Sequence, residues 1–397
     1  MKLQFHLNND LPKVTPLKEE YLRNQVKLLK NIHQPEQKSK EWHEVRNTML
    51  TASDWGTILG QNHYQKPEKV LLDKCGPSKF ITCAAMDWGN KYEDVAVSVY
   101  EHRNKTPVLE FGCLRHPFIS HLGASPDGIT EEGIMLEIKC VVTREITGIP
   151  PPQYWCQVQG QLEVCELDRC DFLECKFKEY ESMEEYLNDY FENNNFNLNK
   201  YGYEKGVIAK FYRESTNSTF YKYSPVNIIG ECLNTWKIDI VKEYGSNDVI
   251  LVSYYYWYLL EASCIPIYRN QEWFNEAKVI LGEFWNKVLK YRELGIEILK
   301  NDLQKEKDEK KEVKEKAKEE KKGSKKQKKM NEYILIDDIV KKSNNDSSES
   351  DESYDGYTFD NNTALFSDDN NVIMTNNTQT SFLSDDNDMT NSSLFSD

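Results

Sequence analysis

The apolar residues that a folded core requires end near residue 300, and this break in composition limits what the chain can fold into. Residues 301–329 are mostly Lys and Glu with almost no apolar stripe, which is typical of a solvated single helix or a charged linker. From Ser343 onward, Ser, Asn, Asp and Thr dominate, and such a composition cannot offset the entropy lost on folding. A globular fold is therefore expected only before residue 300, and residues 343–397 are predicted to be disordered.

Charge is distributed unevenly between these regions. The 397 residues carry a formal net charge of -15, but residues 343–397 alone contain 12 acids and no base. The part expected to fold is therefore only mildly acidic. A mildly acidic body argues against a protein that binds nucleic acid by bulk charge, so any such contact must be a local patch or be assisted by a metal.

The chain shows no signal for secretion or for a membrane. Met1–Asn9 contains no apolar core of a signal peptide, and the apolar run Val249–Leu260 falls short of the roughly 20 residues that a spanning helix needs. A soluble intracellular protein without membrane contact is expected. The ten cysteines include no CxxC pair, so reduced thiols are expected and an iron–sulfur cluster at Cys165, Cys170 and Cys175 is not.

Helical and strand patterns alternate through the first 300 residues. Caps and apolar spacing predict helices over 15–32, 39–50, 53–60, 86–103, 152–164 and 271–291. Strands are predicted over 107–112, 118–124, 133–140, 170–177 and within 207–223. Strands flanked by helices define an α/β fold rather than a helical bundle or a β-sandwich.

The stretch Leu122–Lys139 is predicted to form a hairpin that carries chemistry. If Glu131–Gly133 is a three-residue loop with Gly133 in the left-handed conformation, Asp127 lies opposite Glu137. Opposed residues have β-carbons about 5 Å apart. Glu137 and Lys139 alternate with apolar residues and therefore project from one face of the strand. Two acids and a lysine are thus expected to converge.

Two carboxylates so close repel each other, and a shared proton or a hard divalent cation such as Mg²⁺ relieves the repulsion. A neighbouring lysine favours the cation, because the metal activates water while the ammonium stabilises charge on a phosphate. This pattern predicts phosphodiester hydrolysis. Taken alone, a D-x9-E-x-K spacing is also found in exposed hairpins with a surface Glu–Lys pair.

Further motifs accompany the hairpin, and together they resemble the phage lambda exonuclease and YqaJ viral recombinase group of PD-(D/E)XK nucleases. The motifs occur in the family's order and approximate spacing and cover about residues 39–177; they are Trp42-x-x-x-Arg46, Leu50-Thr51-Ala52-Ser53, Trp88-Gly89-x-Lys91-Tyr92-Glu93, Ser125-Pro126-Asp127-Gly128, Leu136-Glu137-Ile138-Lys139 and Tyr154-x-x-Gln157-x-Gln159. The resemblance implies a restriction-endonuclease-like core with a central mixed β-sheet flanked by helices. Together with the composition, it gives an expected domain organisation of 1–38 as a helical extension, 39–299 as the nuclease domain, 300–342 as a charged linker and 343–397 as an acidic tail.

Site residues follow from the resemblance position by position. It makes Asp127 and Glu137 metal ligands, joined by Glu93 and by the backbone carbonyl of Ile138. Lys139 becomes the catalytic lysine, and Gln157 becomes a glutamine that contacts the site. The expected ion is Mg²⁺, with Mn²⁺ as an alternative.

The resemblance also implies a binding site for the 5'-phosphate of a DNA end. Arg46 and Ser53 match the family's phosphate-binding residues, while a second basic residue of that pocket has no clear counterpart. Trp42, Trp55 and Trp88 are wide enough to stack on bases, although at least two of them are expected to belong to the core.

The resulting hypothesis is an Mg²⁺-dependent deoxyribonuclease that resects duplex ends 5' to 3' for viral DNA recombination, repair or replication. One expected partner is double-stranded DNA with free ends. Three similar acidic motifs, which begin at Leu365, Phe382 and Leu394, suggest as a second partner a single-strand annealing or replication protein. A homo-oligomer and a location in the host cytoplasm or nucleus remain open. The alternatives are an endonuclease using the same site and a non-catalytic scaffold on a nuclease fold.

Overall fold

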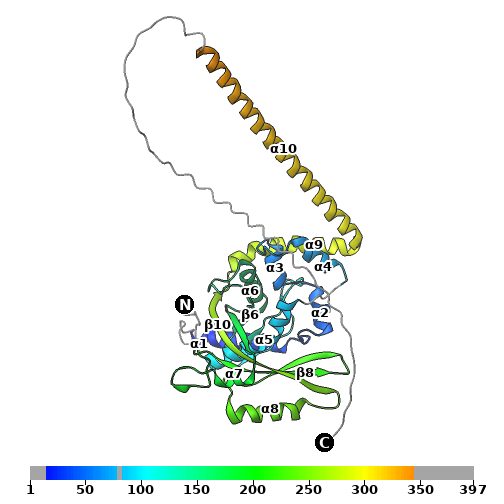
Figure 1. Cartoon of the computed structure of the whole chain (residues 1–397). Helices are drawn as coiled ribbons and strands as arrows, with labels where there is room; N and C mark the ends of the chain where they lie inside the picture. Colours follow the sequence, from blue (N-terminus) through cyan, green and yellow to red (C-terminus); the bar gives the residue numbers. More distant parts are fainter. Residues whose placement is uncertain (1–14, 78–82, 344–397) are drawn as a thin grey trace, which may run out of the picture. The chain divides into compact units, whose positions relative to one another are not determined.

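The computed structural model describes residues 15–77 and 83–343 (Figure 1). The chain divides into two compact units, Met1–Ala317 and Lys318–Asp397. Every strand of the described residues belongs to the first unit. The tail that was predicted to be disordered, with its repeated acidic motifs, lies outside the described residues.

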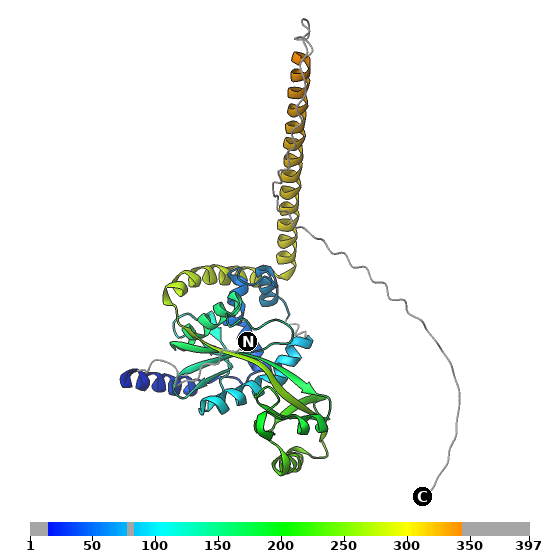
Figure 2. The same cartoon turned by 60° about the vertical axis from the view of Figure 1, so that its left-hand side comes forward.

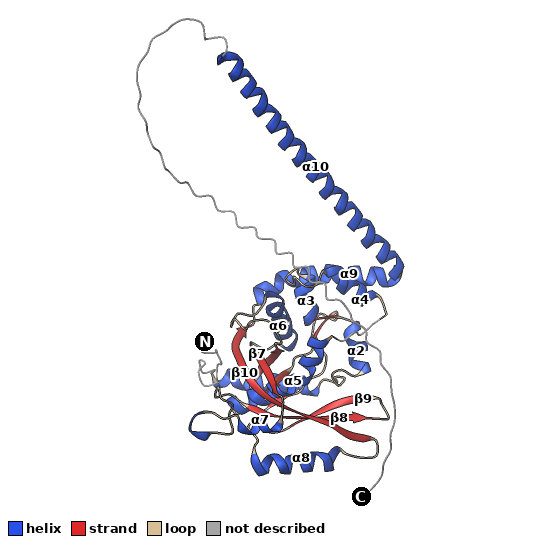
Figure 3. Cartoon of the chain, in the orientation of Figure 1, coloured by secondary structure: helices blue, strands red, loops and turns tan. Residues whose placement is uncertain are grey.

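A seven-stranded sheet organises the first unit. In spatial order its strands are β2 (Val108–Leu109), β5 (Gly128–Thr130), β6 (Ile134–Cys140), β7 (Arg169–Tyr180), β10 (Val249–Tyr268), β8 (Lys205–Arg213) and β9 (Ser218–Tyr223). Only β6 and β7 pair in parallel, because helix α6 (Pro152–Cys165) makes the crossover between them. The other neighbours are antiparallel, so the predicted α/β fold with a central mixed sheet flanked by helices is confirmed (Figure 3).

A second, small sheet contains β1 (Leu50–Thr51), β4 (Leu122–Ala124) and β3 (Leu114–Arg115) in the order β1-β4-β3. Strand β1 pairs in parallel with β4, with Leu50 opposite Leu122. Helix α3 (Ala52–Ile58) begins directly after β1. This pairing brings the start of α3 beside the segment that leads to Asp127.

The central strand β6 is covered on both faces, and its side chains alternate between two cores as the pattern predicted. Leu136 and Ile138 pack in a core that includes residues of helix α5 (Ala84–Asn104), such as Val95. Met135 packs on the opposite face against residues of α6 such as Val158. Glu137 and Lys139 share the α6 face, since strand side chains alternate. The polar groups of the hairpin are therefore placed under α6.

All six predicted helices are present, with shifted ends. The remaining ones are α1 (Pro16–Asn31), α2 (Lys40–Asn47) and α9 (Gln271–Leu294). The helix predicted over 39–50 ends early because Leu50 pairs with Leu122 in the small sheet. Pattern reasoning missed helices α4 (Pro67–Cys75), α7 (Met183–Asn188) and α8 (Gly230–Tyr244).

The 20-residue strand β10 pairs with β7 along one edge and with β8 along the other, and Figure 2 shows it as one long twisted ribbon. The strands predicted within 207–223 are β8 and β9, which pair with each other in antiparallel orientation. Two register shifts interrupt the pairing, between Leu251 and Ser253 against β8 and between Leu259 and Glu261 against β7. Such bulges increase the local twist, which bends β8 and β9 away from the parallel part of the sheet.

Helix α10 (Ile296–Ser343) covers the Lys/Glu-rich stretch. Of the two sequence interpretations, the helix therefore applies to this stretch. None of the described helices is both long and apolar enough to cross a bilayer.

Candidate active site

The hairpin formed by β5 and β6 has the predicted register. Gly128 lies opposite Leu136 and Ile129 opposite Met135, which places Asp127, one residue before β5, at the level of Glu137. Gly133 adopts φ +81°, the left-handed conformation that the short loop requires. Asp127 accepts a hydrogen bond from the backbone N–H of Ile138 at 2.7 Å, which fixes its carboxylate at the edge of β6.

Glu137 is fully buried, and three side chains donate to its carboxylate. Lys139 and Gln157 donate to Oε1, the latter at 2.6 Å, and Gln161 donates to Oε2 at 2.6 Å. Both glutamines lie on one face of α6, four residues apart. A buried carboxylate that is paired and hydrogen-bonded in this way is held in one orientation.

The acids of the site perturb one another. Burial raises the pKa of Asp127, and the nearby charges of Glu137 and Glu93 raise it further. Burial disfavours the charged form of Lys139, but Glu137 and Asp127 outweigh burial and raise the lysine's pKa. Lys139 is therefore an ammonium at neutral pH, with its Nζ 4.8 Å from the centre of the Tyr154 ring. Such a group can stabilise negative charge but cannot accept a proton.

Glu93 reaches the site from the other face of the sheet, on α5. Burial raises the pKa of Glu93, and Lys38, whose Nζ lies 3.9 Å from the carboxylate, opposes the increase. Lys38 was not predicted. It lies in the loop before α2 with φ +66°, and the neighbouring Gln37 donates to the carbonyl of Pro126 at 3.1 Å, which ties this loop to the residue before Asp127.

The donor set suits a hard divalent cation. Within the described ranges no group of three or more His, Cys, Asp and Glu side chains is arranged to hold a metal, so the pair Asp127 and Glu137 would need backbone or water oxygens as further ligands. The mutual repulsion that raises the pKa of Asp127 is what such an ion relieves. Gln161 Oε1 is buried beside Glu137 without a hydrogen-bond partner in the described structure, and it could accept from a bound water.

The predicted phosphate-binding residues contact each other. Arg46 donates to the Ser53 hydroxyl at 3.0 Å and to the Ser125 hydroxyl at 3.3 Å. The Trp42 indole also donates to Ser125, at 3.2 Å, and the Arg46 guanidinium stacks over the Trp42 ring at 4.3 Å. Ser125 belonged to a recognised motif but had no predicted role. Its position two residues before Asp127 joins this cluster to the carboxylates.

The short helix α3 begins at Ala52 rather than at residue 53 as predicted. Thr51 is its capping residue, and Asp54 accepts from the Thr51 backbone N–H at 3.0 Å. Lys74 of α4 lies 3.0 Å from Asp54 and donates to the carbonyl of Arg46 at 3.1 Å. Lys74 is thus a second basic residue beside Arg46, which sequence reasoning missed because α4 itself was missed.

The three regularly spaced cysteines belong to the cores. Cys165 and Cys170 are buried in the α6 core, and Cys175 is buried in the α5 core. Burial raises the pKa of all three thiols, so they remain protonated rather than becoming the thiolates that bind metals.

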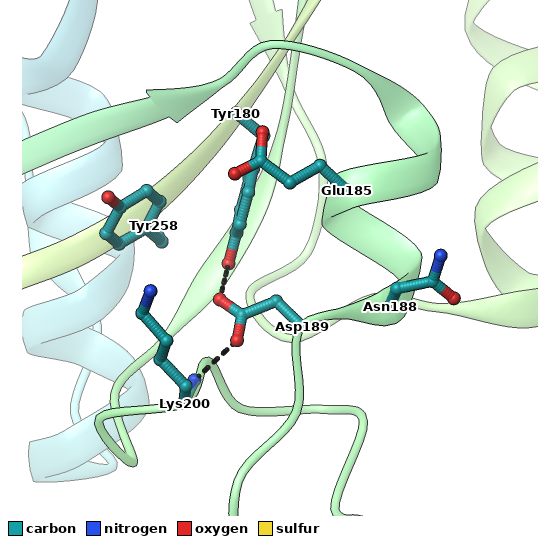
Figure 4. A pocket seen from close by; sticks show the side chains of 6 residues that line it. All are labelled: Tyr180, Glu185, Asn188, Asp189, Lys200 and Tyr258. Atoms are coloured by element: carbon teal, nitrogen blue, oxygen red, sulfur yellow. Dashed lines mark hydrogen bonds between the residues drawn. The ribbon is translucent and has the colours of Figure 1, made fainter.

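A separate polar pocket of about 250 Å³ lies at the β7–α7–β10 end of the unit (Figure 4). Its lining includes Glu185, Asp189 and Lys200. Asp189 accepts from the Tyr180 hydroxyl at 2.7 Å and from the Lys200 backbone N–H at 2.8 Å. The carboxylate is therefore used to hold the fold together, and two acids against one lysine do not favour an anionic substrate.

Comparison with known proteins agrees with the sequence motifs. Residues 41–168 match the model of the YqaJ-like viral recombinase domain. The predicted resemblance is therefore confirmed, and the matched segment contains the carboxylates, Lys139 and the Arg46 cluster.

The relatives are viral proteins. An uncharacterised protein of Acanthamoeba polyphaga mimivirus is 31% identical over 321 residues, which cover 72% of this chain and 58% of the relative. A protein of African swine fever virus (strain Badajoz 1971 Vero-adapted) is 28% identical over 169 residues, 34% of this chain and 48% of the relative. The chain thus spans only about half to three fifths of the length of these relatives.

Two solved structures are similar at a low level. An alkaline exonuclease from Laribacter hongkongensis, LHK-Exo, is 19% identical with a TM-score of 0.38, and covers 67% of this chain and 99% of its own. A phage-related exonuclease from Haemophilus somnus 129PT is 12% identical with a TM-score of 0.33, and covers 64% of this chain and 96% of its own.

Proposed function

We propose that this protein is a divalent-metal-dependent DNA nuclease whose reaction takes place at Asp127, Glu137 and Lys139. The observation that carries the proposal is the convergence of two carboxylates and a lysine that is held as an ammonium. The domain match over residues 41–168 supports the same reading. Mg²⁺ is the expected ion, with Mn²⁺ able to replace it, because all the available ligands are oxygens.

Asp127, Glu137 and the carbonyl of Ile138 would hold the ion, with Glu93 contributing directly or through water. The bound ion supplies a water of lowered pKa and a positive charge for a phosphate oxygen. Gln157 and Gln161 keep the Glu137 carboxylate from turning. Lys139 places positive charge where the phosphate gains negative charge in the transition state.

The Arg46 cluster favours an exonuclease. Arg46, Ser53 and Ser125 provide a guanidinium and two hydroxyls at one point, a set that matches a terminal phosphate. We propose that it binds the 5'-phosphate of a duplex end, so that hydrolysis proceeds 5' to 3'. The match to a viral recombinase domain, together with the viral origin of the relatives, favours a role in resecting ends for viral DNA recombination, repair or replication.

The first test uses the full chain, linear duplex DNA and Mg²⁺. Hydrolysis is expected to need the metal and to fall about 100-fold or more in Asp127→Ala, as when a group central to transition-state stabilisation is removed. Glu131→Gln, an exposed acid at the tip of the same hairpin, is the matched control and should retain activity. Undiminished hydrolysis in Asp127→Ala would reject this site.

The second test concerns the DNA end. Linear duplex with a 5'-phosphate should be degraded faster than duplex with a 5'-hydroxyl, and Arg46→Gln should remove most of this difference. Nicking of closed circular DNA at a comparable rate would instead establish an endonuclease that uses the same carboxylates.

A further inference from the structure

A second pocket lies beyond the C-terminal end of β6, beside the last residues of β7. It has a volume of about 440 Å³ and is lined by Trp88, Val142, Lys176, Phe177, Lys178, Glu179 and Leu260. This volume is within the usual range for small-molecule and cofactor sites, about 300–1,000 Å³. None of these residues belongs to the metal-binding set or to the Arg46 cluster.

The pocket forms where β7 extends beyond the end of β6. The pairing of β6 with β7 ends at Cys140 and Cys175, while β7 continues to Tyr180 alongside β10. Leu260, the bulge residue of β10, and Val142, which leaves the end of β6, complete the walls. The pocket therefore follows from the unequal lengths of these strands.

The lining combines an aromatic ring with positive charge at the edge of β7 beyond β6, where Phe177 faces α5 and the side chains of Lys176 and Lys178 alternate to the opposite face. Trp88 is half-buried and packs against Tyr92 with ring centroids 4.4 Å apart. Its indole Nε1–H is buried and has no hydrogen-bond partner within the described ranges. An indole that is fixed by one ring, and whose donor is unused, is suited to a flat ligand with acceptor atoms.

The lining carries net positive charge, since its charged residues are two lysines and one glutamate. Lys178 is exposed and has no ion-pair partner among the described side chains, and Lys176 lies 3.9 Å from Glu261. The one acid of the lining, Glu179, accepts from Lys91 and Tyr92, each at 2.6 Å. Its charge is thus balanced by Lys91 and that of Lys176 by Glu261, so Lys178 carries the positive charge of the lining that no described side chain balances.

The pocket is close to the scissile position. Val142 follows Lys139 by three residues, so their Cα atoms lie at most about 11 Å apart. Trp88 precedes Glu93 by five residues on α5, which is about 7.5 Å along the helix axis. A DNA strand held at the carboxylates could therefore reach both the ring and the lysines without leaving the surface.

We infer that this pocket binds an unpaired nucleotide of the DNA strand engaged at the active site, with the base on Trp88 and the adjoining phosphates near Lys176 and Lys178. An aromatic ring for the base together with cations along the backbone is how sequence-independent sites hold single strands. The inference rests on the proposed nuclease function, because it assigns the pocket to the same substrate strand.

The test measures binding rather than hydrolysis, using the full chain with Asp127→Ala and a short thymidine oligonucleotide. Adding Trp88→Ala should weaken binding about 5- to 150-fold, the range for loss of one stacked base, while Trp88→Phe should bind nearly as well as tryptophan. An oligonucleotide with abasic positions should bind equally well with and without Trp88→Ala, since removing the base and removing the ring delete the same contact.

A second test replaces the two lysines, so that the conclusion does not depend on whether the tryptophan variant folds. Lys176→Gln with Lys178→Gln should reduce the slope of log binding constant against log salt by about 1.4, or about 0.7 for each single-strand phosphate no longer neutralised. Lys242→Gln, an exposed lysine of α8, is the matched control and should leave the slope unchanged.

The outcomes separate the two proposals. Unchanged affinity and salt slope in the pocket variants, together with metal-dependent hydrolysis by the unmodified protein, would overturn the pocket and leave the nuclease standing. Loss of affinity in Trp88→Ala without any hydrolysis by the unmodified protein would support a single-strand site and reject the nuclease.

Discussion

Lys139 forms a hydrogen-bonded ion pair with Glu137, and its ammonium is kept charged by Glu137 and Asp127. Replacing it with Met keeps most of the stem and removes only the charge. Lys139→Met should lower single-turnover hydrolysis about 100- to 1,000-fold, as expected when one stabilising group of the transition state is lost. Lys40→Met, at an exposed lysine of α2, is the control. A rate within about tenfold of normal would show that Lys139 only supports the structure.

Lys205 offers a pH-dependent test of the fold away from the active site. Its side chain is fully buried, and Nζ donates to the backbone carbonyls of Tyr186 and Asp189. Burial lowers the pKa of Lys205 to about 8 from 10.5. Between these values the unfolded chain binds more protons than the folded one, so stability must rise with pH in this window.

Removing the lysine should remove this gain. Relative to Lys205→Met, the unmodified protein should gain about 2–3 kcal/mol of unfolding free energy between pH 8 and 10.5, at about 1.4 kcal/mol for each unit of pKa shift. Urea unfolding of both proteins across this range measures the difference, and titrating tyrosines and cysteines cancel in it. A constant difference would mean that Lys205 titrates normally in the folded protein.

Sequence reasoning reached those residues whose roles follow from spacing. The proximity of Asp127, Glu137 and Lys139 could be predicted, because a three-residue loop determines which residues are opposed and strand alternation determines which share a face. Ser125, Lys38 and Lys74 could not, since a loop serine or a single lysine has no pattern and their contacts depend on tertiary packing. The resemblance supplied Glu93, Arg46 and Ser53.

At the scale of elements, the short connection from β4 to β5 explains why the two parts of the site are adjacent. It consists of Ser125, Pro126 and Asp127. Ser125 therefore meets Arg46 beside the small sheet, while Asp127 meets Glu137 in the large one. A connection of three residues therefore joins the Arg46 cluster to the two carboxylates.

The same scale shows where patterns failed. The run of tyrosines within β10 has no clear period of two, and two bulges interrupt the alternation of side chains along the strand. Its length could not be predicted from alternation. Helix α8 was missed because it buries only Leu233 and Ile240, too few for a visible apolar stripe.

The contact between α3 and α6 gives a prediction that links packing to the site. A β-carbon at Gly160 would lie 2.8 Å from the Trp55 ring and 3.0 Å from the β-carbon of Ala52. Gly160→Ala must therefore push α6 away from α3, at a cost of about 1–3 kcal/mol for overpacking. Since α6 carries Gln157 and Gln161, the Glu137 carboxylate should lose alignment and hydrolysis should fall together with the melting temperature.

A glycine of another helix is the control for this experiment. A β-carbon at Gly282 of α9 would meet nothing within 4 Å, so Gly282→Ala should stabilise the protein by about 0.5–1 kcal/mol through backbone entropy. Thermal unfolding of both variants, with hydrolysis measured at the same temperature, compares them. If Gly160→Ala is as stable and active as the unmodified protein, α6 does not position the site.

For the whole molecule, charge and fold are separated along the chain. The unit Met1–Ala317 contains the described sheets and the candidate site, whereas residues 343–397 contribute 12 acids and no base. The negative charges of this tail repel the phosphates of DNA, and the repulsion extends over about one Debye length, roughly 10 Å at 0.1 M salt. The tail should therefore affect encounter with DNA more than the chemical step.

Deleting residues 343–397 tests this separation. Hydrolysis at saturating DNA should stay within about twofold of the full chain, because no residue of the site is removed. Association with DNA should become faster at low salt, since electrostatic steering alters association rates by about tenfold or more, and the two proteins should converge as salt is raised. Stopped-flow binding at several salt concentrations measures the effect. An equal salt dependence in both proteins would mean that the tail does not shield the site, and a loss of hydrolysis would mean that it contributes to the reaction.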